Sequence, residues 1–146
     1  MTDRWMRSLL VLAAIFLMAA ISLRAQDKPK EIKKTPIADV SPSSGAEMFN
    51  SYCAPCHGKE AKGNGPAASV LKVPPANLTL LAKKNGGKFP ADHVSSILKN
   101  GTSPAHGSSD MPIWGPLFSY VSGQDNAIVQ MRISNLIHYL ESIQEK

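Results

Sequence analysis

The sequence predicts an all-α domain with long loops. Apolar residues recur about every 3.6 positions between residues 125 and 144, which predicts a long helix near the end of the chain. No run of alternating apolar and polar residues reaches the length of a strand. Two stretches, 59–75 and 102–116, are rich in Gly, Pro, Ala and Ser, and we interpret them as loops.

Three shorter helices are expected before the last one. The first covers about 45–52, behind Ser43 or Ser44 as the capping residue. The second covers 78–84, with Asn77 or Thr79 near its start and two glycines at its end. The third covers 91–99 and ends at Asn100-Gly101. Asp125 or Asn126 then begins the long helix, which runs to about Gln144.

Length and composition exclude several classes of protein. The 146 residues suffice for one domain, and 43% of them are apolar, which argues against a disordered chain or a multi-pass membrane protein. The net charge of +5 is modest and its lysines are scattered, so we expect no nucleic-acid binding. The chain has only two cysteines, which disfavours both a zinc ribbon and a disulfide-stapled scaffold.

The first 25 residues have the features of an export signal. Arg4 and Arg7 precede an uncharged apolar run, and its residues 9–23 would rise about 22 Å as a helix. A membrane core is about 30 Å thick, so the run is short for a permanent span. Cleavage after Ala25 and an uncleaved N-terminal membrane tether both stay open. We expect a flexible linker over 26–44 and one domain over 45–146, located in the periplasm.

The motif that carries the chemistry is Cys53-Ala-Pro-Cys56-His57. The spacing C-x-x-C-H is typical of covalent attachment of a c-type haem, with two thiols on the vinyl groups and the histidine beneath the iron. A thiol–disulfide oxidoreductase is the alternative, because such sites also use C-x-x-C. That alternative expects a preceding strand, and a helix is predicted there instead.

The opposite side of the iron needs a second ligand. Met111 is the first candidate, since it lies in a loop that Pro112 stiffens, directly before the last helix. His106, in the same loop, is its main competitor. Three further residues are weaker candidates for this ligand, namely His93, Met131 and His138.

Around these residues the chain resembles the class I cytochromes c of bacteria. The resemblance rests on Gly45 and Phe49 before the motif, on Leu136-Ile-His-Tyr139-Leu140 in the last helix, and on Met111-Pro-Ile-Trp114-Gly. It implies a helical fold around one haem with histidine and methionine ligands, and a close crossing of the two terminal helices. It also implies a proline carbonyl, from Pro74 or Pro75, that holds the His57 ring. Trp114 either donates its indole N–H to a haem propionate or only packs.

The expected function is one-electron transfer rather than catalysis, because an iron with both axial positions filled does not readily bind oxygen or peroxide. We expect a monomer that exchanges electrons with redox partner proteins outside the cytoplasm. A haem subunit fixed in an oxidase or dehydrogenase complex is the alternative. Several lysines could steer the domain to an acidic partner, although an ordinary solvated surface explains them equally well; they are Lys59, Lys62, Lys72, Lys83, Lys84, Lys88 and Lys99.

Overall fold

The computed structural model describes residues 37–101 and 110–146, and within these residues it contains helices, turns and loops but no strand. The predicted all-α class is confirmed. The α-helices are α2 (Gly45–Met48), α3 (Ala54–His57), α4 (Leu81–Lys84), α5 (Ala91–Asn100), α6 (Trp114–Val121) and α7 (Asn126–Ser142). The predicted export signal and membrane tether lie outside the described residues, as does the segment 102–109.

The first helical stretch is longer than predicted. Helix α2 begins after Ser44, whose hydroxyl accepts a hydrogen bond from the Glu47 N–H at 3.2 Å and so caps the helix. A π-helical turn, Phe49–Cys53, joins α2 directly to α3. The helical stretch therefore continues through the whole Cys-x-x-Cys-His motif, whereas the sequence predicts that the helix ends at about residue 52, before the motif.

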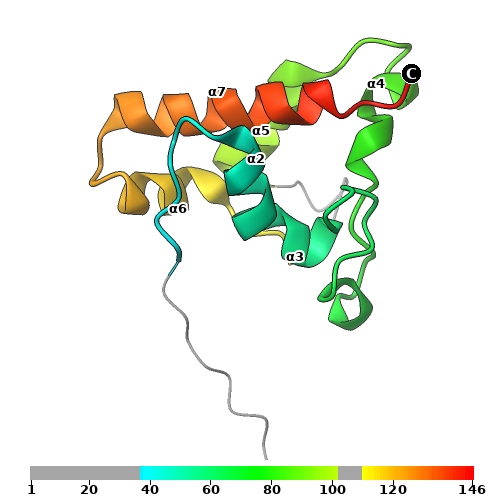
Figure 1. The fold of residues 1–146 in the computed structure, drawn as a ribbon, viewed down its shortest axis with the longest axis horizontal. Coiled ribbons are helices and arrows are strands. Elements are labelled where there is room, and N and C mark those ends of the chain that lie inside the picture. The colour runs from blue at the N-terminus through cyan, green and yellow to red at the C-terminus, as the bar shows by residue number, and fades with distance from the viewer. Residues whose placement is uncertain (1–36, 102–109) are drawn as a thin grey trace, which may run out of the picture. The chain divides into compact units, whose positions relative to one another are not determined.

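The crossing of α2 with α7 confirms the predicted contact between the terminal helices (Figure 1). A Cβ atom added to Gly45 would overlap the main-chain carbonyl oxygen of Asn135 and lie 2.8 Å from the Tyr139 Cβ. One turn further, the rings of Phe49 and Tyr139 pack with their centroids 5.3 Å apart. Phe49 and Leu136 are fully buried, so this crossing forms the centre of the apolar core.

The end of the expected linker packs on the domain. The Tyr52 hydroxyl donates to the Ala38 carbonyl at 2.6 Å, and the Asn135 amide donates to the Pro42 carbonyl at 2.9 Å. Arg132, which is 2% exposed, donates to the Val40 carbonyl and to Asp39. Residues 38–42, hereafter the strap, thus belong to the folded part, and the domain begins before residue 45.

The short helices follow the predicted pattern with one correction. The predicted helix over 78–84 consists of a 3-10 turn, Leu78–Leu80, followed by α4, and Asn77 caps this turn by accepting from the Thr79 N–H at 3.0 Å. The prediction of a loop up to residue 116 is wrong, because α6 already begins at Trp114. Pro116 disguised this helix, yet a proline is tolerated in the first turn, where main-chain N–H groups have no partner within the helix. Helix α6 packs with α5 and α7.

Candidate functional site

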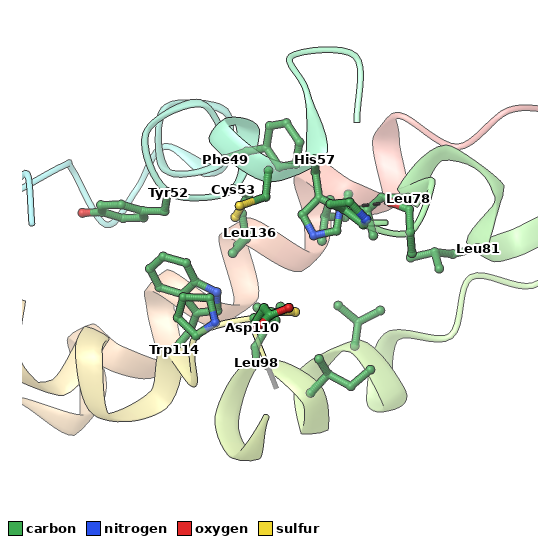
Figure 2. A pocket seen from close by; sticks show the side chains of 18 of the residues that line it. Phe49, Tyr52, Cys53, His57, Leu78, Leu81, Leu98, Asp110, Trp114 and Leu136 are labelled. Carbon is green, nitrogen blue, oxygen red and sulfur yellow. Dashed lines mark hydrogen bonds between the residues drawn. The ribbon is translucent and has the colours of Figure 1, made fainter. Parts of the chain in front are cut away.

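A cavity of about 380 Å³ lies between the first helical stretch and α5, and it brings all six predicted site residues together. Its walls include Cys53, Cys56, His57, Pro74, Met111 and Trp114. Figure 2 shows the His57 ring pointing into the cavity from one side, with Leu98 and Asp110 on the opposite side. A volume of this size is typical of a site for a small organic ligand.

The loop after α3 fixes the position of the two cysteines and His57. An α-helix leaves its last four carbonyl groups without partners inside the helix. Here the loop supplies all four N–H donors, at 2.7–3.0 Å, to the carbonyls of residues 54–57; the donors are Gly58, Gly63, Gly65 and Ala67. A Cβ on Gly65 would lie only 2.6 Å from the Ala54 carbonyl oxygen, so this close return of the loop needs a glycine.

The His57 ring is oriented by a main-chain carbonyl, but not by the one predicted. Its Nδ1 lies 3.0 Å from the carbonyl oxygen of Ala76. The prediction of a Pro74 or Pro75 carbonyl is therefore wrong, although both prolines line the cavity. The Pro75 carbonyl lies against the main chain of Gly63, and the next carbonyl along the chain, that of Ala76, faces the ring.

The protonation of His57 suits a ligand for a metal. Burial lowers the pKa of His57, and the hydrogen bond to Ala76 opposes this effect. A carbonyl oxygen can only accept, so Nδ1 carries the hydrogen. In the neutral ring Nε2 then has a free lone pair, which is the form that coordinates iron.

The environment of the cysteines disfavours dithiol redox chemistry. Burial, with a smaller contribution from the nearby Cys56, raises the pKa of Cys53 to about 12. An oxidoreductase needs a thiolate at neutral pH, which usually forms at an exposed helix N-terminus or beside a cation. Cys53 lies inside a continuous helical stretch, and both thiols are free rather than joined in a disulfide.

Only two of the described candidates for the second axial ligand, Met111 and His93, line the cavity. Met111 lines the cavity and packs against the core. Met131 and His138 are exposed on α7 and are not among the cavity-lining residues. His93 does line the cavity, from α5, which the sequence did not indicate. His106 lies outside the described residues.

Trp114 is buried at the start of α6 and belongs to an aromatic cluster. Its ring centroid is 5.5 Å from those of Tyr52 and Phe118, which anchors the beginning of α6 beside the cavity. Figure 2 shows Trp114 on the cavity wall. This position is compatible with both predicted roles of Trp114, packing alone or a hydrogen bond from its indole N–H to a bound group.

The cavity fits a flat, mostly apolar macrocycle held at its edge and through its centre. Apart from the residues above, its walls are largely aliphatic and aromatic, including Phe49, Leu71, Leu78, Leu81, Val94, Ile97, Leu98, Leu136 and Leu140. Haem c needs two thiols to bond its vinyl groups and, for histidine–methionine ligation, one imidazole and one thioether to bind its iron, and the cavity wall contains all of these groups. In the part of the chain that the structure describes, no group of three or more His, Cys, Asp or Glu could hold a metal ion instead.

Three contributors to the site were not predicted from the sequence. The Ala76 carbonyl and the loop amides are main-chain groups, so no residue type marks them. Asp110 also lines the cavity, and only its position beside Met111 could have drawn attention to it.

Comparison with known proteins agrees with this geometry. The family model of cytochrome c oxidase, cbb3-type, subunit III matches residues 40–130, which include the whole motif, the strap from Val40 onward and Met111. Searches of curated proteins and of solved structures found no match to this chain. The chain thus belongs to the class I cytochrome c family, whose domains carry covalently bound haem c and transfer electrons.

Proposed function

We propose that the domain is a one-electron carrier in which Cys53 and Cys56 hold the haem, and His57 and Met111 are its axial ligands. The observation that carries the proposal is that these four residues line one apolar cavity although Met111 is 54 positions from His57 in the chain. His57 lies at the end of α3, which the following loop holds through hydrogen bonds, and Met111 lies three residues before the buried start of α6.

Each residue has a role that follows from its surroundings. The Ala76 carbonyl fixes the His57 ring and leaves Nε2 free toward the cavity. Haem iron with imidazole and thioether ligands exchanges one electron at a raised potential, because the thioether favours the ferrous state. Aliphatic walls keep water from the site, and Pro74 contributes its ring to them. Trp114 donates its indole N–H to a haem propionate or completes the wall.

We also propose that this carrier works outside the cytoplasm, with residues 1–25 as export signal or tether. No helix within 37–101 and 110–146 is both long and apolar enough to cross a membrane. Its partners would be redox proteins, and the exposed lysines near the cavity, such as Lys59 and Lys72, could favour acidic partner surfaces.

Mass spectrometry and a pair of methionine variants test the proposal. The chain expressed in a host that matures cytochromes c should gain the mass of one haem, bound to the peptide that contains Cys53 and Cys56. Met111→Ala should abolish the weak red absorption band of a thioether–iron(III) bond and lower the midpoint potential. Met131→Ala is the matched control, since this side chain is 46% exposed on α7. A band that survives in Met111→Ala would assign the iron to another methionine. A parent protein that lacks the band would point to a histidine ligand instead, and His93→Ala and His106→Ala would then be tested.

The match to subunit III of cbb3-type cytochrome c oxidase favours a second candidate function, that of a haem subunit fixed in an oxidase complex. Size-exclusion chromatography of detergent-solubilised membranes separates the two. A carrier elutes near its own mass, whereas a fixed subunit co-elutes with the oxidase.

A further inference from the structure

We propose that Asp110 is a positioning residue that fastens Met111 to the same short segment that orients His57. The inference rests on the proposed function, because it concerns how the second axial ligand is held. It arises from one contact that bridges two distant parts of the chain. The Lys72 main-chain N–H donates to the Asp110 Oδ2 at 3.4 Å.

The segment from Lys72 to Ala76 makes a contact with each side of the cavity. At its end, the Ala76 carbonyl accepts from the His57 ring at 3.0 Å. At its beginning, the Lys72 N–H reaches the residue next to Met111. His57 and the residue before Met111 are thereby both hydrogen-bonded to the same five consecutive residues.

The sequence of this segment makes it stiff enough to act as a spacer. Pro74 and Pro75 have their φ angles locked by the ring, and Val73 is biased toward extended conformations because a proline follows it. The separation between the Lys72 N–H and the Ala76 carbonyl therefore varies little. A shift of this segment would therefore act on both ligands. Loss of the Lys72–Asp110 hydrogen bond would act on Met111 alone and leave the contact between Ala76 and His57 intact.

Met111 lies between two fixed points. On one side Asp110 is bound to Lys72, and on the other side Trp114 is buried at the start of α6 against Tyr52 and Phe118. Figure 2 shows Asp110 across the cavity from His57, on the side from which the thioether must approach. A weak ligand gains most from such an arrangement, because a side chain that is already ordered loses less entropy on binding.

The chemistry of the contact predicts a modest effect. A carboxylate that accepts from a main-chain N–H forms a charge-assisted bond, which is stronger than a bond between neutral groups. This bond is long and exposed, so its loss should weaken retention of Met111 roughly three- to tenfold, below the usual range for charged groups. Asn retains an acceptor oxygen at this position, and Ala does not.

Four variants of the haem-loaded protein test the inference. The measured quantities are the red thioether–iron(III) band and the affinity of the ferric protein for imidazole, which competes with Met111. Asp110→Ala should weaken the band and raise imidazole affinity about three- to tenfold, and Asp110→Asn should restore most of the parent behaviour. Lys72→Pro removes the N–H donor without changing Asp110 and should shift both quantities in the same direction as Asp110→Ala. Lys72→Ala keeps the N–H and should match the parent.

The controls separate this inference from the proposed function. Asp92→Ala removes an exposed acidic residue from α5 and should change neither quantity. If Asp110→Ala and Lys72→Pro both keep the parent band and imidazole affinity, Asp110 does not position Met111. If the parent itself lacks the band, or keeps it in Met111→Ala, the ligand assignment fails instead. Should Lys72→Pro fail to fold, the Ala–Asn comparison at Asp110 still decides.

Discussion

The crossing of the terminal helices and the cavity wall opposite it are built by different means. At the crossing, α2 and α7 contact each other through buried side chains and a glycine, and the chain is helical on both sides of the contact. Part of the cavity wall is loop, at 71–76 and 110–112, and two hydrogen bonds tie residues 72–76 to distant parts of the chain, from the His57 ring to the Ala76 carbonyl and from the Lys72 N–H to Asp110. The first region can be stable through its own packing. The second leaves its apolar side chains facing a space that only a ligand would fill.

The largest expected effect comes from preventing attachment of the haem. Without the haem, the apolar walls of the cavity of about 380 Å³ lose the surface against which they pack, and such losses grow with cavity volume. A domain is stable by only about 5–15 kcal/mol, so a loss spread over this many core side chains should remove much of its stability. The double variant Cys53→Ala/Cys56→Ala should therefore lose its fixed side-chain packing, seen as loss of the near-ultraviolet circular dichroism. A cooperative thermal transition at the parent temperature would show that the helix crossing suffices alone.

Overpacking the crossing is expected to have the next largest effect. Gly45→Leu places a side chain where even a Cβ overlaps the Asn135 carbonyl, so the helices must separate. The free energy of unfolding should fall by about 3 kcal/mol, near the upper end for overpacked sites. Thermal melting of the haem-loaded protein measures it. Ala46→Leu is the control, because Ala46 is exposed one position further on the same helix. Equal melting temperatures for the two variants would contradict the close crossing.

A substitution of a glycine beside the cavity should lower the free energy of unfolding less than Gly45→Leu does, but it should also reduce haem attachment. Gly65→Ala brings a Cβ to within 2.6 Å of the Ala54 carbonyl, so the loop must withdraw from the end of α3. We expect a loss of about 2 kcal/mol and less haem per chain, because the carbonyls of the cysteine-bearing turn lose donors. Haem content by pyridine haemochrome and the melting temperature check this, with the exposed Ser69→Ala in the same loop as control. Full haem content with parent melting would mean that the loop has room to adapt.

The contrast between the two regions also explains what the sequence could predict. Regular packing leaves a periodic signal, so the last helix was predicted correctly, and Asp125 is the one of its two expected first residues that caps it. The contact of Gly45, Phe49 and Tyr139 was implied by the resemblance to class I cytochromes c, and the structure confirms it. The motif and Met111 were recognisable as candidates because their chemistry depends on residue type. Their place in one cavity follows from the fold, while their roles at the iron stay predictions.

What the sequence did not reveal depends on main-chain groups and on distant partners. The acceptor for His57 is a carbonyl, which every residue has, so only the path of the loop selects Ala76 over Pro75. Helix α6 was missed because Gly115 and Pro116 in its first turn resemble a loop. The strap was read as linker because its bonds reach Arg132, more than 90 positions away.

The smallest expected effect, that of Asp39→Asn, comes from the strap, and its comparison with Arg132→Leu tests how the strap is held to the helix crossing. Buried Arg132 donates to the Val40 carbonyl, to the Ser122 hydroxyl at 3.0 Å and to Asp39 at 3.2 Å, whereas the Asp39 side chain is 82% exposed. Arg132→Leu should lower the free energy of unfolding by about 2 kcal/mol, because these acceptors lose a shared donor while the apolar stem is replaced. Asp39→Asn should cost at most about 0.5 kcal/mol, since an exposed ion pair is screened by water and salt.

Chemical denaturation of the haem-loaded variants measures how much stability Arg132→Leu and Asp39→Asn lose. Limited proteolysis shows which part of the chain becomes accessible in each variant. In Arg132→Leu the cleavage sites should extend into residues 38–42, while the red absorption band stays at its parent strength because the strap does not line the cavity. A weakened band in Arg132→Leu would mean that the two regions are coupled through the core. Equal losses for Arg132→Leu and Asp39→Asn would mean that the ion pair, rather than the main-chain contact with Val40, holds the strap.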